Sequence, residues 1–377
     1  MAYSRDIWSG PDAARLQDLL FSFKERLSSH GYFEFYKSFG DGNSKTDLWR
    51  HAAGRLSGKL RQCVDFFLLQ CPLSKSDLAG LVGAECSKLF FEYPIVTGQN
   101  GAVQCDLQLV SFQGLAFFVE LTRQLPEVYF GADSVALGIY QNIKEGSKVL
   151  DLCAGGGLQG LVASNSAGDV TCVEVNPRAA KIARFNVALN GRCKRVRVIN
   201  ENALEFVTGL ETKVDHILFN PPLLPVPKTV KFPFVGAGGA DGLELTRSFI
   251  DKCSNKLNMG GRMEFVGTCL ADGLGKLLID DLIKSARTAG VNGELFVLSR
   301  HKLEKGAVLY DGLILTAAGC DGRTFNEISD LYRHHFDSLR AKEMMLFFAR
   351  LHKNGSSTKS PFKHVDLTHG LYGDWFC

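Results

Sequence analysis

The sequence predicts an α/β protein whose main element is a mostly parallel, doubly wound sheet. From about residue 147 onward, short apolar segments alternate with helical segments, which is typical of parallel strands joined by crossover helices. A glycine-rich turn directly follows the first of these apolar segments. The chain has 377 residues, 45% of them hydrophobic and 22% charged, so it can bury more than one core. The predicted strands are 148–152, 170–175, 195–199, 214–219, 262–267, 293–299 and 344–352.

The N-terminal third of the chain has a different pattern and predicts a separate domain. Residues 11–30 and 46–70 carry apolar side chains at helical spacing. The turn sequence GQNG at 98–101 lies between two extended runs and predicts a β-hairpin. Helices followed by such a hairpin resemble a winged-helix module, and a generic helical cap with a β-ribbon fits equally well. The predicted division is a substrate-selecting domain at 1–125 and a sheet domain at 126–377 with an insertion near 301–342.

The glycine-rich turn, in the sequence VLDLCAGGGLQG, predicts a site for an adenosine-containing ligand. Gly155, Gly157 and Gly160 have the spacing that lets a backbone turn tightly and approach a ligand closely. Glu174 ends the next predicted strand, where a carboxylate can accept hydrogen bonds from two ribose hydroxyls. Asp151 lies just before the glycines and would repel a pyrophosphate, but it would attract a cationic ligand. A sulfonium-containing nucleoside therefore fits this turn better than a dinucleotide.

These motifs resemble those of the class I S-adenosylmethionine-dependent methyltransferases, over about residues 127 to 300. The segment VLDLCAGGG is similar to their first motif, and Glu174 to their ribose-binding acid. In the segment ENALEF, Asn202 stands where the family usually has Asp. The resemblance implies a seven-stranded Rossmann-like sheet and S-adenosyl-L-methionine as the cofactor. The cofactor-binding residues that it implies are Asp151, Ala154, Gly155, Gly157, Glu174, Val175, Asn202, Ala203 and Asn220.

The stretch DHILFNPPLLPVP ends a predicted strand in a way that predicts nitrogen chemistry. Two consecutive prolines cannot continue a sheet, because neither has a backbone donor. An amide or aromatic amine nitrogen is a poor nucleophile, and it needs acceptors that hold its hydrogens while the new bond forms. The side-chain oxygen of Asn220 and the carbonyl of Pro221 supply two such acceptors. We predict Asn220, Pro221 and Pro222 as the catalytic residues.

The same stretch resembles the (Asn/Asp/Ser)-Pro-Pro-aromatic signature of amino methyltransferases. Release-factor glutamine methyltransferases and ribosomal-RNA guanine and adenine methyltransferases carry that signature. This chain departs from it, because Leu223 replaces the aromatic residue that normally stacks on a flat acceptor. Phe232 or Phe234 are candidates to substitute for that ring. The departure favours a smaller or non-planar acceptor over a base.

Two further segments are predicted to contribute to the substrate side of the site. Residues 127–137 resemble the stretch that leads into the cofactor pocket of these enzymes, where Asp133 or Ser134 could instead cap a helix. The sequence GGADGLE resembles a Gly-Asp-Gly segment of the glutamine enzymes and gives residues 239–242 a loop position near the site. The predicted substrate-binding residues are Tyr129, Phe130, Asp133, Leu223 and Phe232.

We interpret the chain as a methyltransferase acting on a nitrogen of a protein glutamine or of a small metabolite. The alternatives are a methyltransferase for a ribosomal or transfer RNA base, and a natural-product enzyme that transfers another carbon of the cofactor. A binding module that has lost catalysis is disfavoured by the intact Asn-Pro-Pro. The net charge of +3 does not favour nucleic acid, although a local basic patch would leave it possible.

The remaining composition excludes several classes of protein. The eleven cysteines are scattered without a CxxC pair, so we expect free thiols in the cytoplasm rather than a zinc ribbon or a disulfide framework. The histidines share no ligand spacing with carboxylates, and we predict no metal site. The sequence starts without an apolar run for a signal peptide, and no stretch approaches the roughly 18 apolar residues of a membrane span. The sequence leaves the acceptor and the oligomeric state open.

Overall fold

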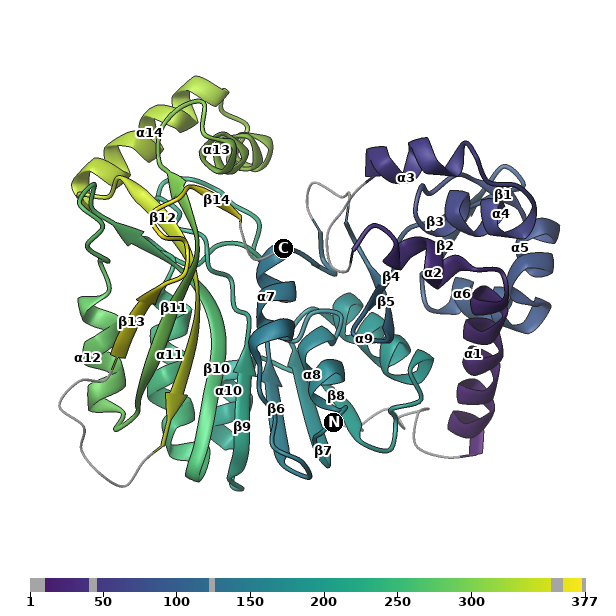
Figure 1. The fold of residues 1–377 in the computed structure, drawn as a ribbon, viewed down its shortest axis with the longest axis horizontal. Coiled ribbons are helices and arrows are strands. Elements are labelled where there is room, and N and C mark those ends of the chain that lie inside the picture. The colour runs from purple at the N-terminus through teal and green to yellow at the C-terminus, as the bar shows by residue number, and fades with distance from the viewer. Residues whose placement is uncertain (1–10, 41–45, 122–125, 354–361, 375–377) are drawn as a thin grey trace. The chain divides into compact units, whose positions relative to one another are not determined.

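The computed structural model describes residues 11–40, 46–121, 126–353 and 362–374, and it confirms the predicted fold class (Figure 1). The main sheet has the strand order β13-β11-β12-β10-β9-β6-β7-β8, with β14 paired to β11. It has nine strands where seven were expected, because residues 362–374 add β13 (Phe362–Asp366) and β14 (Gly373–Asp374). The seven expected strands are β6 (Lys148–Leu152), β7 (Asp169–Glu174), β8 (Val196–Asn200), β9 (Val214–Phe219), β10 (Leu257–Ala271), β11 (Asn292–Lys302) and β12 (Glu343–His352).

Residue contacts divide the chain into two compact units that alternate along the sequence. Unit 1 is Met1–Ala132 with Ala154–Asn200, and unit 2 is Asp133–Cys153 with Glu201–Cys377. Residues 154–200 group with the first unit, and the division at residue 125 stays a prediction.

Unit 1 begins with helices and a small sheet, as the sequence predicted. The expected helix at 46–70 is two helices, because Gly54 starts a break that ends with Gly58 at φ +62°. Ser74 caps α5, since its hydroxyl oxygen accepts a hydrogen bond from the backbone N–H of Asp77 at 3.0 Å. The helices are α1 (Pro11–Ser29), α2 (Tyr32–Lys37), α3 (Thr46–Ala53), α4 (Gly58–Phe67), α5 (Lys75–Val82) and α6 (Ala84–Glu92). Strands β1 (Leu73–Ser74), β2 (Val96–Gln99) and β3 (Ala102–Cys105) form a sheet in the order β1-β3-β2.

A hairpin of β4 (Gln108–Phe112) and β5 (Leu115–Val119) joins this part of unit 1 to α9 (Pro177–Leu189). Asn190, the C-cap of α9, bonds both backbone groups of Ala116, at 2.9 and 2.7 Å. One helical turn earlier, Asn186 bonds both backbone groups of Phe118, at 2.8 and 3.2 Å. Two carboxamides therefore satisfy the backbone of β5 along its length. Unit 1 also contains β7, the parallel strand β8, and α8 (Leu158–Ala163).

Unit 2 contains the other strands of the main sheet. Strand β9 pairs in parallel with β6 and β10, whereas β12 runs antiparallel to both β10 and β11. Strand β9 has four buried residues in succession at its C-terminal end, as expected for a strand covered on both faces. The helices of this unit are α7 (Ala132–Tyr140), α10 (Ala203–Gly209), α11 (Glu244–Cys253), α12 (Asp280–Thr288), α13 (Val308–Asp321) and α14 (Phe325–Ser338), with a 3₁₀ turn at Ser254–Lys256.

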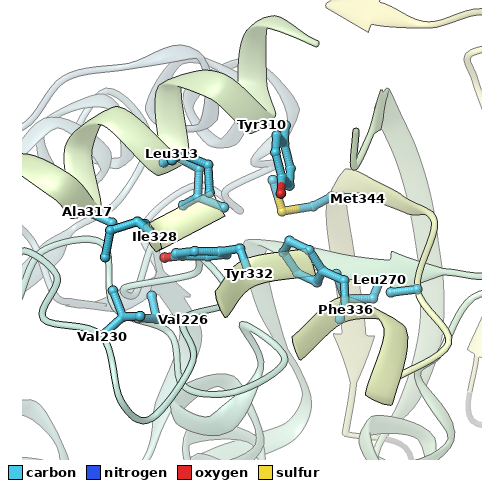
Figure 2. Close-up of a cluster of buried hydrophobic side chains, with 12 residues drawn as sticks. Val226, Val230, Leu270, Tyr310, Leu313, Ala317, Ile328, Tyr332, Phe336 and Met344 are labelled. Atoms are coloured by element: carbon cyan, nitrogen blue, oxygen red, sulfur yellow. The ribbon is translucent and has the colours of Figure 1, made fainter. Parts of the chain in front are cut away.

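The predicted insertion near 301–342 contains a helical hairpin, α13 and α14, that follows β11 (Figure 1). A capping box at Thr324 and Glu327 starts α14. The facing sides of the two helices form a buried cluster that includes Tyr310, Tyr332 and Phe336 (Figure 2). Val226 and Val230, from the segment that follows the Asn-Pro-Pro, are buried in the same cluster. The hairpin therefore anchors the loop that extends from the end of β9.

Candidate functional site

Asn220 follows β9 directly, and its side chain is held by the first turn of α7. Its Nδ2 donates to Oδ2 of Asp133 at 2.7 Å and to the hydroxyl oxygen of Ser134 at 3.2 Å. A carboxylate can only accept hydrogen bonds, so this contact determines which end of the carboxamide faces α7. Both acceptors are buried.

The other end of the same carboxamide has no partner in the structure. The Oδ1 atom of Asn220 is buried and accepts no hydrogen bond. Leaving a buried acceptor unsatisfied costs about 1–3 kcal/mol, so such an atom calls for an explanation. A bound group with an N–H donor would remove this cost.

The loop after the Asn-Pro-Pro is held by close backbone packing. A Cβ at Gly238 would lie 2.7 Å from the carbonyl carbon of Leu223, and one at Gly242 would lie 2.5 Å from the Leu223 oxygen. Gly242 also has φ +80°, which a larger residue adopts with strain. The hydroxyl of Thr268 on β10 donates to the same Leu223 carbonyl. The GGADGLE segment thus lies against Leu223.

Side chains of α11 and α14 hold the GGADGLE loop (residues 238–244) in place. Asp241 binds Arg247 on α11 through two hydrogen bonds, at 2.7 and 2.9 Å. Burial is the largest single influence and acts to raise the pKa of Asp241. The hydrogen bonds from Arg247 and from the backbone N–H of Leu243, together with the charge of Arg247, outweigh it, so this pKa lies below its ordinary value. His335 on α14 makes a 2.6 Å hydrogen bond to the carbonyl of Ala240. Asp241 is therefore an anchor of the loop.

The predicted substrate-side residues after the Asn-Pro-Pro differ in their surroundings. Leu223 is half-buried and packs against a cluster that includes Leu137 and Val266. Phe232 packs on the cluster around α13 and α14, with a ring edge close to Gly236. Phe234 is 71% exposed and leaves its ring available.

The glycine-rich turn in unit 1 is organised around Glu174. Oε2 of Glu174 accepts from the backbone N–H of Gly155 at 2.7 Å, and Oε1 accepts from that of Asn176 at 2.7 Å. Burial raises the pKa of Glu174, and the hydrogen bonds from Asn176, Gly155 and Val175 oppose that rise. Each carboxylate oxygen retains a second lone pair with which it can accept a ligand hydroxyl.

The environment of this turn fits an adenosine group. A Cβ built on Gly155 would meet no atom within 4 Å, so there is space in front of the turn. Val175 follows a buried strand but is 42% exposed, which leaves an apolar surface beside Glu174. Gly157 has φ +83° and begins α8, and a Cβ there would touch Ala183. These residues can hold a nucleoside through its ribose hydroxyls and one face of its base.

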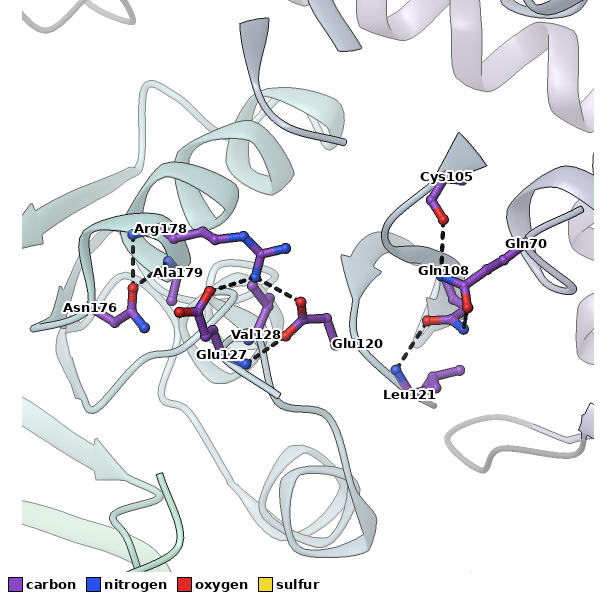
Figure 3. A network of polar contacts seen from close by, with 10 residues as sticks. All are labelled: Gln70, Cys105, Gln108, Glu120, Leu121, Glu127, Val128, Asn176, Arg178 and Ala179. Carbon is purple, nitrogen blue, oxygen red and sulfur yellow. Dashed lines mark hydrogen bonds and ion pairs between the residues drawn. The ribbon is translucent and has the colours of Figure 1, made fainter. Parts of the chain in front are cut away.

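A charged network fixes the chain beside this turn (Figure 3). Nη1 of Arg178 on α9 binds Glu120 at 2.7 Å and Glu127 at 2.9 Å. The second oxygen of Glu120 accepts from the backbone of Glu127 and Val128. The next residue, Tyr129, is 44% exposed, and Phe130 is buried. The network therefore positions the two aromatic residues that were predicted on the substrate side.

The other predicted cofactor residues occupy the ends of strands or the starts of helices. Asp151 is buried near the end of β6, and Ala154 donates to the carbonyl of Val173 at 3.1 Å. Asn202 caps α10, since its Oδ1 accepts from the backbone of Leu204 at 2.9 Å and of Glu205 at 3.3 Å. Ala203 is buried in the first turn of that helix.

Sequence reasoning missed four residues of these sites: Ser134 as a partner of Asn220, Asn176, Gly238 and Thr268. Asn176 caps α9, and an asparagine directly before Pro177 is a readable cap signal. Ser134 was considered only as a helix cap. For Thr268 and Gly238 the sequence offers no local signal, because each acts on the distant Leu223.

Among the described residues, no group of three or more histidine, cysteine or acidic side chains could hold a metal ion. Within the same part of the chain, the helices are too short or too polar to cross a membrane.

Comparison with known proteins identifies the family. The model of the methyltransferase small domain matches residues 132–299. A provisionally assigned protein N5-glutamine methyltransferase of Methanocaldococcus jannaschii is 34% identical over 151 residues, which are 38% of this chain and 74% of that protein. The chain belongs to the methyltransferase small domain family. It is an S-adenosyl-L-methionine-dependent methyltransferase, as the sequence motifs predicted.

The names of other relatives indicate two kinds of methyl acceptor. A tRNA1(Val) (adenine(37)-N6)-methyltransferase of Shewanella is 27% identical, over 54% of this chain and 90% of that protein. A release factor glutamine methyltransferase of Clostridium acetobutylicum is 25% identical, over 53% and 75%. Among solved structures, the tRNA m1G37 methyltransferase of M. jannaschii has a TM-score of 0.39 and 15% identity, over 69% of this chain and 59% of that one.

Proposed function

We propose that this methyltransferase transfers a methyl group to the side-chain amide nitrogen of a glutamine in a protein. The observation that carries the proposal is the buried, unsatisfied Oδ1 of Asn220, whose carboxamide is fixed at its other end by Asp133 and Ser134. An amide nitrogen offers two hydrogens, and Oδ1 with the Pro221 carbonyl would accept them. The glutamine specificity in the names of two relatives supports this choice.

The chain's own residues would divide the work between holding the cofactor and holding the acceptor. Bound S-adenosyl-L-methionine supplies an electrophilic methyl group. Glu174, Gly155 and Val175 would hold its ribose and adenine, together with the other predicted contacts at Asp151, Ala154, Gly157, Asn202 and Ala203. Asn220 and Pro221 would keep the amide hydrogens bonded while the C–N bond forms and the methyl–sulfur bond breaks, and the nitrogen would then release one of these hydrogens as a proton to solvent. Pro222 would stiffen this turn.

The substrate side of the site favours an amide over a planar base. Leu223 has no π-face and is partly engaged with the core of unit 2. It would press on a flexible aliphatic side chain, with Tyr129, Phe130 and Phe232 as further proposed contacts. A small metabolite with an amide or amine group would satisfy the same contacts.

A transfer RNA adenine is the second candidate, and the Shewanella relative favours it. The exposed face of α6, the helix that directly precedes the hairpin of β2 and β3, argues against nucleic-acid docking there. That face carries Glu85 and Glu92 beside Lys88, so it would not attract phosphates. Glu85 is also paired with Arg15 on α1.

We propose that residues 1–125 select a protein substrate and that the reaction occurs in the cytoplasm.

Methyl-labelled cofactor tests the acceptor class. The protein is incubated with S-adenosyl-L-[methyl-³H]methionine and with total protein or total RNA from the source cells. We expect label in protein, and release of labelled methylamine on acid hydrolysis, because only an N-methyl amide gives that product. Asn326→Ala on the exposed face of α14 serves as the matched control for Asn220→Ala.

Other distributions of label would overturn the proposal. Label in RNA would establish the base alternative, and label only in small molecules would establish a metabolite acceptor. Formation of methylthioadenosine in place of S-adenosylhomocysteine would show that another carbon of the cofactor is transferred.

A further inference from the structure

We infer that Asp133 is a positioning residue that orients the Asn220 carboxamide, which goes beyond its predicted place at the cofactor or substrate. The inference rests on the proposed function only for the identity of the acceptor. Its basis is the 2.7 Å contact between Asn220 Nδ2 and Asp133 Oδ2, in the first turn of α7. The two residues are 87 positions apart in the sequence.

The chemistry of the pair explains why a carboxylate stands at residue 133. A carboxamide can rotate by half a turn and exchange its oxygen with its nitrogen at little cost in shape. A carboxylate accepts only, so it excludes the rotamer that would turn the Asn220 oxygen toward α7. Ser134 accepts the second hydrogen at 3.2 Å, which leaves Oδ1 as the one unused group of the carboxamide. Asp133 thus keeps an acceptor directed away from α7.

This arrangement changes the expectation for Asn220→Asp. From the sequence alone, Asn220→Asp is expected to lower turnover only mildly, because a carboxylate still accepts hydrogen bonds from an amine. In the structure it would place two carboxylates in direct contact, where both cannot remain ionised without strong repulsion. The exchange Asp133→Asn with Asn220→Asp restores one donor and one acceptor in reversed order. In that double variant, the amide at 133 donates to the carboxylate at 220, whose second oxygen stays free to accept.

The test compares the wild type, Asp133→Asn, Asn220→Asp and the double exchange. Turnover is measured as S-adenosylhomocysteine formed with total protein from the source cells as the acceptor. We expect turnover to fall about tenfold in Asp133→Asn and at least a hundredfold in Asn220→Asp. The double exchange should recover at least tenfold over Asn220→Asp. A residue that only stabilises α7 would show no such rescue.

A second readout keeps the inference testable if protein proves not to be the acceptor. In protein labelled with ¹⁵N at asparagine side chains, the Asn220 NH₂ pair is assigned by its loss in Asn220→Asp. We expect one of its protons to resonate downfield of ordinary carboxamides, and to return to the ordinary range in Asp133→Asn. The double exchange should give a new downfield pair from residue 133.

Two controls define the outcomes that would overturn the inference. Asp280→Asn, which removes an exposed acid from the first turn of α12, should leave turnover unchanged. Calorimetry with S-adenosylhomocysteine should give the same affinity for all four proteins, and a loss confined to residue 133 variants would make Asp133 a cofactor ligand. An unshifted NH₂ pair in the wild type, or a double exchange no more active than Asn220→Asp, would remove the positioning role. Failure of the proposed function alone would leave the NH₂ shift in place.

Discussion

A polar side chain lies at the end of β7 and another directly after β9, and the two differ in how far their hydrogen bonds are satisfied. At the end of β7, both oxygens of Glu174 are already bonded to backbone N–H groups of neighbouring turns. After β9, the nitrogen of Asn220 is bonded twice while its oxygen has no partner. Glu174 therefore holds two neighbouring turns in place. Asn220 is itself held in place by α7, and its side-chain oxygen remains without a partner.

This difference supports the proposal that Glu174 binds the cofactor and that Asn220 acts in catalysis. A carboxylate that already satisfies two backbone donors is rigid before a ligand arrives, and it has lone pairs left for two hydroxyls. An acceptor that is buried without a partner is preorganised for a donor that arrives with the substrate. Removing Glu174 should therefore affect affinity, and removing Asn220 should affect rate.

The largest effect is expected for Asn220→Ala. Loss of one preorganised polar contact at a reacting centre costs about 10²–10³ in rate. Affinity for S-adenosylhomocysteine should change by less than about threefold, since the glycine turn and Glu174 remain. Steady-state turnover and calorimetry measure the two quantities. Wild-type turnover in this variant would reduce the Asn-Pro-Pro to a strand terminator and remove the main support for nitrogen methylation.

Glu174→Ala should give the opposite pattern. Loss of the ribose contacts, at about 1.5–3 kcal/mol, weakens cofactor binding by roughly ten- to a hundredfold. Thermal stability should also fall, because the N–H groups of Gly155 and Asn176 lose their acceptor. Asp169→Ala, at the start of the same strand, is the control and should keep the affinity. Unchanged affinity in calorimetry of Glu174→Ala would take this residue out of the site.

Gly238→Ala should lower turnover, because it disturbs the segment that follows the Asn-Pro-Pro. Its Cβ would lie within 2.8 Å of the Leu223 backbone, so the segment after the Asn-Pro-Pro has to move. Misplacement of a reacting group by about 1 Å can cost up to 10²-fold, and we expect at least tenfold in turnover with little change in cofactor affinity. Gly312→Ala on α13, where a Cβ meets nothing within 4 Å, is the control. Equal turnover in both variants would show that the loop does not position Asn220.

The sequence predicted the parts of both sites that depend on local pattern. Alternating strands and helices, the glycine turn and the acid after β7 are all readable within short windows. The meeting of Asp133 with Asn220 was not predicted, because 87 residues separate them and neither signal refers to the other. The split of the helix at 46–70 was missed because apolar spacing continues across Gly54 and Gly58.

The smallest expected effect concerns His216 on β9, which, like Asn220 after the same strand, has a buried polar atom without a partner. Its Nε2 accepts from the backbone N–H of Lys144 at 3.2 Å, and its Nδ1 is buried without a partner. Burial, with repulsion from Arg262, lowers the pKa of His216 from 6.5 to about 4. The buried imidazole of His216 therefore stays neutral in the folded protein, and this affects the stability of the fold.

The sign of the pH dependence follows from this lowered pKa. Between pH 6.5 and about 4 the unfolded chain binds a proton at residue 216 and the folded protein does not. The free energy of unfolding contributed by His216 is therefore fully present above pH 6.5 and is lost as the pH falls through that window. In His216→Gln the side chain cannot titrate, and its Oε1 can still accept from Lys144. We expect a smaller fall in Tm between pH 7 and 5 than in the wild type, with turnover unchanged, whereas His334→Gln on the exposed face of α14 should follow the wild type. A large loss of turnover in His216→Gln would contradict this structural role and would show that His216 contributes to the reaction.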